Sequence, residues 1–276
     1  MKRKIFSRLF FVIGFLLCAA PLVLGLIAGL EQKSVISSFN QTVSASENTA
    51  EEALKNADEY NTRLWQAQGA IVGNADAEFY SDENYESQLN LAGTGLMGSI
   101  SIPKINISLP IYHGTDDEVL SKGVGHLQGS SLPVGGENSR SVLTAHRGLP
   151  NSKLFTRLDE LETGDLIFLD ISSRKLAYEV ENIEVIDPED MDKLQTVGGK
   201  DLITLVTCTP YGINTHRLLV TAHQVPYSEM AAQAVMPAPP SWRELIFASL
   251  PFIFIFIGLY RPIKDFFHKR KERTYE

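Results

Sequence analysis

Three residue types in this sequence could together perform acyl transfer at a carbonyl carbon. Cys208, His146 and Arg217 each stand at the boundary of a β-like run. An ordinary thiol, with a pKa of about 8.5, is largely protonated at neutral pH, and a neighbouring cation stabilises the thiolate nucleophile. Imidazole can return a proton to a leaving amine, and guanidinium stays charged while it binds a carbonyl or an oxyanion. We therefore predict Cys208 as the nucleophile that forms a thioacyl intermediate, His146 as general acid and base, and Arg217 as the stabiliser of substrate and oxyanion.

The chain has two cysteines, and they lie in very different surroundings. Cys18 falls within an apolar N-terminal stretch, and Cys208 falls deep in the polar part of the chain, so a disulfide between them is disfavoured. An unpaired thiol in an exported domain is a candidate reactive group. A buried, inert Cys208 is the open alternative, and a structural role is open for His146 and Arg217 when each is considered alone.

Local patterns predict how these residues are positioned. The run Leu202–Cys208 alternates with period two, which places Cys208 on the same face as Val206. A turn-rich loop follows, and a second strand begins near Leu218. If the two strands pair antiparallel, Arg217 lies beside Cys208. His146 also ends a strand, so three strand ends are predicted to share one rim.

The pattern of short β-rich segments across the middle of the chain predicts an all-β dominated domain. Short β-rich runs separated by glycine, proline and asparagine are typical of a barrel or a sandwich. An amphipathic helix is predicted at Thr49–Gln66, followed by an acidic loop. The predicted strands are Met97–Ile102, Ile105–Tyr112, Ser141–His146, Leu166–Asp170, Leu176–Asp187, Leu202–Cys208 and Leu218–Gln224, and short helical pieces are predicted at Ser152–Leu161 and Asp190–Gln195.

Two apolar stretches predict a membrane protein. Ile5–Leu30 is long enough to cross a bilayer, and Leu245–Leu259 is shorter, with aromatic residues at both ends. Lysines and arginines flank both stretches on their outer sides, so we expect both termini in the cytoplasm and the domain outside the cell. A cleaved secretory signal is the alternative for the first stretch. The part between the basic flanks holds 15 basic and 30 acidic residues, a formal charge of about −15, which argues against nucleic acid as a partner.

The residues around the predicted site resemble the signature of the sortase family. Thr204-Leu205-Val206-Thr207-Cys208, with Arg217 at the start of the next strand, is similar to the sortase Thr-Leu-x-Thr-Cys strand and its arginine. The likeness covers roughly residues 95–227. It also includes Gly98-Ser99-Ile100-Ser101-Ile102-Pro103, Leu109-Pro110-Ile111-Tyr112-His113-Gly114, Gly125-His126-Leu127, Leu143-Thr144-Ala145-His146-Arg147-Gly148 and Thr215-His216-Arg217-Leu218.

Two membrane segments and the stretch from Cys208 to Arg217 resemble class C, the pilus-polymerising sortases of Gram-positive bacteria. The resemblance implies an eight-stranded sortase β-barrel. It also implies a reaction: Cys208 cleaves a Leu-Pro-x-Thr-Gly-like sorting signal of a pilin between threonine and glycine, and the acyl group passes to a lysine amine of the next pilin. No metal or organic cofactor is implied, and no histidine pair has metal-ligand spacing. His113, His126 and His216 are predicted to be structural.

Class C sortases usually carry a lid before the barrel, in which an Asp-Pro-aromatic motif covers the site. The nearest match here is Asp76-Ala77-Glu78-Phe79, which lacks the proline and has the ring one residue late. Lid contacts through Asp76 and Phe79 are one hypothesis, and an acidic loop without fixed contacts is the other.

These observations predict an ordered set of segments and leave two rival functions open. A cysteine protease that hydrolyses its thioester uses the same residues, and a membrane-tethered binding module would use Cys208 only structurally. The predicted segments are an anchor or signal at 1–30, a helical region at 31–71, a lid loop at 72–94, the catalytic barrel at 95–227, a linker at 228–244, a transmembrane helix at 245–260 and a cytoplasmic basic tail at 261–276.

Overall fold

The computed structural model describes residues 2–67, 82–149 and 152–272 of the chain. Contacts divide the chain into two compact units. One consists of Met1–Ile27 with Pro239–Glu276, and the other of Ala28–Ala238. All the strands of the described residues belong to the larger unit.

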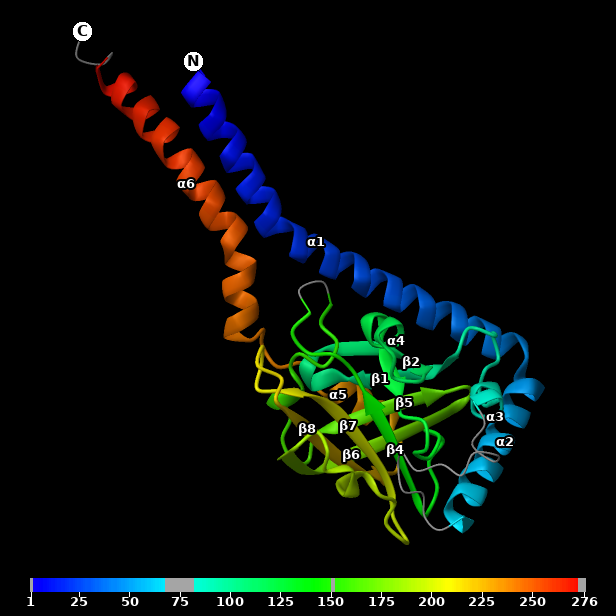
Figure 1. Cartoon of the computed structure of the whole chain (residues 1–276). Coiled ribbons are helices and arrows are strands. Elements are labelled where there is room, and N and C mark those ends of the chain that lie inside the picture. Colours follow the sequence, from blue (N-terminus) through cyan, green and yellow to red (C-terminus); the bar gives the residue numbers. More distant parts are fainter. Residues whose placement is uncertain (1, 68–81, 150–151, 273–276) are drawn as a thin grey trace. The chain divides into compact units, whose positions relative to one another are not determined.

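Eight strands of the larger unit close into a barrel (Figure 1). Their order around it is β1-β2-β3-β4-β7-β8-β6-β5, with β5 pairing back to β1. The β2–β3 and β4–β7 pairs are parallel and the other pairs are antiparallel. The predicted eight-stranded barrel is thus confirmed. The strands are β1 (Leu96–Ile102), β2 (Ile107–His113), β3 (Val124–His126), β4 (Ser139–Thr144), β5 (Leu166–Ile171), β6 (Arg174–Ile186), β7 (Asp201–Thr209) and β8 (His216–Val225).

Helices precede, interrupt and follow the barrel. The α-helices of the described residues are α1 (Lys2–Ala45), α2 (Glu47–Gln66), α3 (Asp82–Ser87), α4 (Asp117–Lys122), α5 (Glu229–Ala234) and α6 (Trp242–Glu272). Three short 3-10 helices are η1 (Pro103–Ile105), η2 (Leu158–Glu160) and η3 (Met191–Leu194).

Strand β7 is buried on both faces. Ile203 and Leu205 belong to the main core inside the barrel. Val206 points the other way, into a second apolar cluster with Val142 of β4 and Leu194 of η3. This alternation follows from the two-residue period of a strand and explains why β7 carries aliphatic residues on both of its faces.

Helix α2 is fastened to the barrel by apolar and polar contacts. Its buried residues Leu54 and Leu64 belong to the same core cluster as the barrel interior. The Asn61 side chain accepts a hydrogen bond from the backbone N–H of Leu132 at 2.7 Å and donates one to the Leu132 carbonyl at 3.0 Å. Arg174 donates to both carboxylate oxygens of Asp58, at 2.7 and 2.8 Å. The amphipathic helix predicted before the barrel is confirmed as part of its core.

The smaller unit consists of two helical segments that contact each other. The rings of Phe11 in α1 and Phe254 in α6 lie 5.9 Å apart. The Phe254 ring also comes so near to Gly14 that a Cβ there would lie 2.9 Å from a ring carbon. Small residues of this kind allow close approach of two helices.

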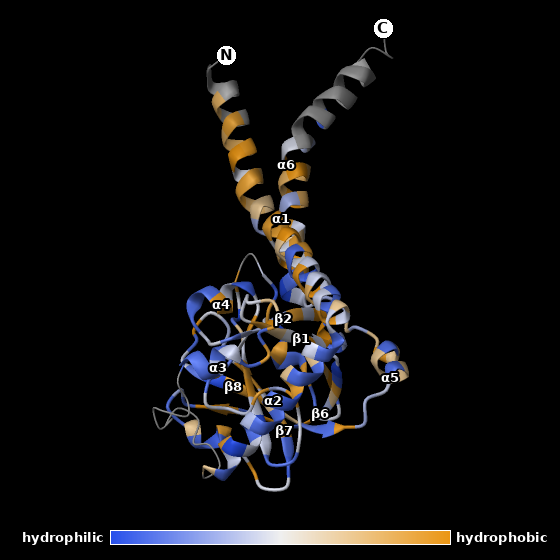
Figure 2. Cartoon of the chain, turned by 90° about the vertical axis from the view of Figure 1, so that its right-hand side faces the viewer, coloured by the Kyte–Doolittle hydropathy of each residue, from blue (hydrophilic) through white to orange (hydrophobic). Residues whose placement is uncertain are grey.

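Figure 2 shows the first part of α1 as largely hydrophobic. Among the described residues, Leu9–Ala45 is the one helical stretch long and apolar enough to cross a membrane. The predicted span at 245–260 is helical, and its membrane insertion stays a prediction.

The structure corrects several predicted elements. Strand β3 was missed because three residues are too few to display an alternating pattern. Strand β2 begins at Ile107 instead of Ile105, because Pro103–Ile105 forms a 3-10 turn. The linker at 228–244 contains helix α5, whose first turn is capped by the Ser228 hydroxyl accepting from the Ala231 N–H at 3.4 Å.

Candidate active site

Cys208 lies at the outer face of β7, one residue before the strand ends at Thr209. Strand alternation places its side chain on the face of Val206, away from the barrel interior that holds Leu205. The residue is half-buried, unlike the fully buried residues that precede it in the strand. The thiol is therefore held on a rigid element and is accessible at its end.

Arg217 lies directly across from Cys208. Strands β7 and β8 form an antiparallel hairpin in which Cys208 and Arg217 are paired residues. Directly opposite side chains in such a pair share one face of the sheet. The Arg217 guanidinium donates to the carbonyl oxygen of His216 at 3.1 Å and of Asn214 at 3.4 Å, both at the end of the connecting loop.

His146 reaches the same level on the other side of β7. Strand β4 runs parallel to β7, with Thr144 paired to Val206. Beyond this pair the Ala145 N–H donates to the Val206 carbonyl at 3.2 Å, and the Thr207 hydroxyl donates to the Ala145 carbonyl at 2.8 Å. Extended two residues beyond this last pair, the same register matches His146 with Cys208.

Cys208 and Arg217 thus share the outer face of the β7–β8 hairpin, and His146 follows the end of the neighbouring strand β4. The apolar cluster formed by Val142, Val206, Leu219, Ile186 and Leu194 lies on the same outer side of the sheet, because Val206 and Leu219 precede and follow the paired Cys208 and Arg217 by two residues. Strands β4, β7 and β8 are neighbours, as predicted, but β4 spans Ser139–Thr144, so His146 lies two residues beyond the strand that it was predicted to end.

Comparison with known proteins identifies the family of this chain. A family model described as the sortase domain matches residues 100–225. The solved structure of sortase C1 from Streptococcus agalactiae has 45% sequence identity to this chain and a TM-score of 0.67, and the match covers 71% of this chain and 100% of that one. The chain belongs to the sortase family.

Other solved structures similar to this sortase include sortase A from Corynebacterium diphtheriae, in a lid mutant. That protein has 41% identity and a TM-score of 0.62, over 68% of this chain and 100% of that chain. Sortase C-1 from Actinomyces oris has 43% identity and a TM-score of 0.59, over 65% of this chain and 99% of that chain. The resemblance to class C sortases predicted from the sequence is confirmed.

Two curated relatives match a shorter region. Sortase D of Bacillus subtilis is 39% identical over 114 residues, which is 41% of this chain and 54% of that protein. Sortase A of Streptococcus agalactiae is 32% identical over 130 residues, which is 46% of this chain and 52% of that protein. The matched region of this sortase therefore spans about half the length of these curated relatives. Sortases as a family are cysteine transpeptidases.

The predicted lid residues Asp76 and Phe79 lie outside the described residues. The following segment, predicted as loop, contains helix α3. Asp82 and Glu83 lie in the first turn of α3, where negative charge interacts favourably with the helix dipole. The side chain of Tyr85 is only 2% exposed, and its burial packs α3 against the barrel. A helix of six residues is too short to display a helical period, so the sequence did not predict α3.

Histidines 113 and 126, predicted to be structural, are both buried and contact Tyr85. The Tyr85 hydroxyl lies 2.9 Å from His126 Nδ1, and His126 Nε2 lies 2.9 Å from the Ser131 carbonyl oxygen. Burial lowers the pKa of His126 to about 4. Burial also lowers the pKa of His113, although its hydrogen bonds to the Gly95 and Gln88 carbonyls act in the opposite direction.

His216 is exposed and lies next to Arg217 in β8, so alternation directs it to the opposite face. Its Nδ1 lies 2.8 Å from the Thr215 hydroxyl, and its Nε2 lies 3.5 Å from an Asp187 carboxylate oxygen. Among the described residues, no group of three or more histidines, cysteines, aspartates and glutamates is placed to hold a metal ion.

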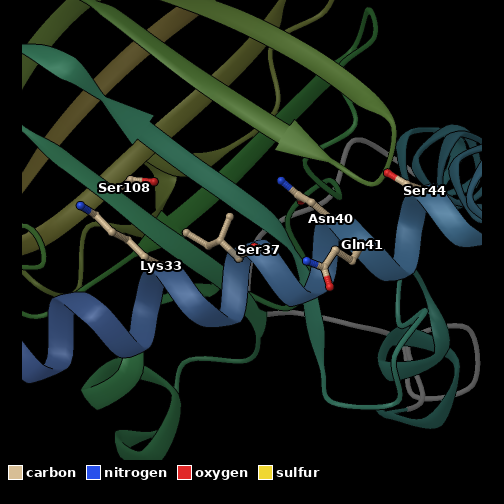
Figure 3. Close-up of a pocket in the computed structure, with 7 residues that line it drawn as sticks. Lys33, Ser37, Asn40, Gln41, Ser44 and Ser108 are labelled. Carbon is tan, nitrogen blue, oxygen red and sulfur yellow. The ribbon is translucent and has the colours of Figure 1, made fainter.

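A groove of about 580 Å³ lies between α1 and strand β2 in the larger unit (Figure 3). Polar side chains line much of it, among them Lys33 and Gln41 from α1 and Ser108 from β2. None of the three predicted catalytic residues lines this groove. The candidate active site is instead the open strand-end face around Cys208.

Sequence reasoning missed one buried charge beside the site. Arg147 stands in the sequence only as part of the motif stretch around His146, yet its side chain is only 2% exposed. An arginine immediately after a strand-terminal histidine gives no periodic signal, so burial could be seen only in the tertiary structure.

Proposed function

We propose that this sortase is a class C cysteine transpeptidase that joins pilin subunits. Cys208 acts as nucleophile on a Leu-Pro-x-Thr-Gly-like sorting signal, His146 as general acid and base, and Arg217 as the group that binds the scissile carbonyl. The proposal is supported chiefly by one observation, the shared level of these residues at the ends of β4, β7 and β8. It is also supported by the similar sortase C1 of GBS pilus island 1, which is 39% identical over 94% of its length.

The first half-reaction forms a thioester. The Cys208 thiolate attacks the threonine carbonyl carbon, and Arg217 stabilises the oxyanion that develops. The bond from that carbon to the glycine nitrogen breaks, and the His146 imidazolium gives its proton to the departing amine. The pilin is then held on sulfur, and the glycine side of the signal leaves.

The second half-reaction restores the thiolate. The neutral lysine amine of the next pilin attacks the thioester carbon. His146, now neutral, takes a proton from that nitrogen as the bond forms. The carbon–sulfur bond breaks and an amide bond forms. Water at the same carbon would give hydrolysis, so the nature of the acceptor separates a transpeptidase from a protease.

We further propose that the chain is anchored in the cell membrane, with the barrel on the extracellular face and both termini in the cytoplasm. The apolar helix Leu9–Ala45 and the basic residues at the outer ends of both apolar stretches support this topology. A protease added to intact cells should digest the barrel and leave tags at both termini protected. Protection of the barrel, or loss of either tag, would contradict this arrangement.

The activity is tested with the full chain in detergent micelles and a pilin that carries a Leu-Pro-x-Thr-Gly signal and an acceptor lysine. Native protein is compared with Cys208→Ala, with and without acceptor, by gel and mass spectrometry. Covalent ladders that need Cys208 establish transpeptidation, whereas cleavage without joining in the presence of acceptor favours the hydrolase. Unchanged pilin in every lane, also in an Asp76→Ala, Phe79→Ala background, would contradict an enzymatic role and favour a binding module.

A further inference from the structure

Arg147 is a buried cation that immediately follows His146. Its side chain is 2% exposed and its NH2 group forms a short ion pair with Asp159, next to Leu158 in η2. Its Nε is buried and has no hydrogen-bond partner among the described residues. Burying a guanidinium carries a large desolvation penalty, and a neutral side chain of similar size usually gives equal or greater stability. Stability alone therefore accounts poorly for an arginine at this position.

The contacts of Arg147 extend to the strand that carries the cysteine. Its NH1 group donates to the Thr209 hydroxyl at 3.3 Å. Thr209 directly follows Cys208 in β7, and strand alternation turns the two side chains to opposite faces. Arg147 thus approaches the cysteine strand from behind the catalytic face and does not reach the thiol side.

The guanidinium also supports the loop that follows β7. Its central carbon lies 5.6 Å from the centroid of the Tyr211 ring, within the range of a cation–π contact. The same ring lies against Gly148, where a Cβ would meet a ring carbon at 3.2 Å. One side chain therefore contacts the loop between Cys208 and Arg217 as well as the residue next to Cys208.

The segment around η2 also holds the backbone of His146. The Phe155 N–H donates to the His146 carbonyl at 3.1 Å, and the Gly148 N–H donates to the Thr156 hydroxyl at 3.1 Å. Arg147 joins this segment, through Asp159, to the end of β7. The last paired residues of the β4–β7 ladder are Thr144 and Val206, and the bonds between Ala145 and β7 are the last direct links between the two strands, so Arg147 supplies the next connection.

We propose that Arg147 is a positioning residue that sets the separation of His146 and Cys208 by clamping the ends of β4 and β7 to each other and to the loop of Tyr211. The proposal rests on the catalytic roles given above to His146 and Cys208. Only arginine suits this task, because its rigid fork directs separate N–H groups to Asp159 and Thr209 while its flat face meets a ring. Lysine keeps the charge but presents it at a single point.

The test compares Arg147→Lys with Arg174→Lys in the full chain in detergent micelles. Arg174 is a matched control, because it also forms an arginine–carboxylate pair, with Asp58, but lies at the end of β6 opposite to Ile186, the residue paired with Arg217. The readouts are kcat and KM for joining a Leu-Pro-x-Thr-Gly pilin to its acceptor, and the rate of Cys208 alkylation by iodoacetamide at neutral pH. Site-resolved mass spectrometry separates Cys208 from Cys18, the other free cysteine.

Arg147→Lys is expected to lower kcat about 10- to 100-fold while KM stays within about twofold, because misplacing reacting groups by about an ångström has effects of this size. Alkylation of Cys208 should slow with it, whereas Arg174→Lys should leave both quantities within about twofold. Thr209→Val, which removes only the acceptor hydroxyl, should lower kcat in the same direction by a smaller factor.

Unchanged kcat and alkylation in Arg147→Lys, or equal losses in Arg174→Lys, would overturn the proposal. If Arg147→Lys does not fold, Thr209→Val decides: native kcat and alkylation there would also overturn it. Failure of the native protein to join pilins contradicts the proposed function instead. In that case alkylation still reports on the clamp, because it needs no substrate.

Discussion

Acidification should destabilise this sortase in part through the buried imidazole of His126. His126 is fully buried, and burial lowers its pKa to about 4, with His113 adding to the effect and the hydrogen bond to the Ser131 carbonyl opposing it. A neutral ring suits its partners, since Nε2–H donates to Ser131 while Nδ1 accepts from the Tyr85 hydroxyl. In the unfolded chain the same ring takes up a proton near its ordinary pKa of about 6.5.

The sign and size follow from proton linkage. Between about pH 6.5 and pH 4 the unfolded state holds one more proton at this site than the folded state, so stability falls as the pH falls. The gap between the two pKa values corresponds to about 3 kcal/mol, at about 1.4 kcal/mol per pH unit. The loss begins near pH 6.5 and is complete near pH 4.

The assay is urea unfolding of the full chain in detergent micelles at several pH values, for the native protein and His126→Gln. Glutamine keeps one donor and one acceptor but does not titrate in this range. Every other titrating group is common to both proteins, so the difference between the two free energies of unfolding isolates His126. We expect this difference to shrink by about 3 kcal/mol from pH 7 to pH 4. A difference independent of pH would refute the reasoning.

Three further predictions concern single side chains. Tyr85→Phe should cost about 1–3 kcal/mol, measured by urea unfolding at neutral pH, because the Gly114 N–H and His126 lose a buried partner. Asn61→Ala should cost a similar amount in the same assay, because both backbone groups of Leu132 lose their hydrogen bonds, and native-like stability in either variant would contradict the assigned bonds. Arg217→Lys should lower kcat/KM for pilin joining by about 100-fold, since a point charge cannot replace the fork at the oxyanion, and a loss below threefold would argue against that role.

Much of the site could be predicted because its parts are local. Cys208 and Arg217 lie on two consecutive strands joined by one short loop, so alternation within each strand and the turn residues between them are enough to make them neighbours. The residues that face the barrel interior could also be predicted, since Ile203 and Leu205 alternate with Thr204 and Val206 along β7.

Other features depended on contacts between distant segments. The level of His146 relative to Cys208 is set by the parallel register of β4 and β7, which no local spacing encodes. Helix α3 and strand β3 are too short to display a period, and they are held by the Tyr85–His126 contact between them.

The sequence by itself thus predicted most of the strands and the pairing of Cys208 with Arg217, because periodicity, turn chemistry and a family signature act over a few residues. Only the tertiary structure decided which distant strand lies beside β7 and which charges become buried there. Arg147 is the clearest case, because its burial arises from Asp159, Thr209 and Tyr211, which come from other segments of the chain. Burial is a property of the assembled chain, because it depends on which surfaces the fold brings together.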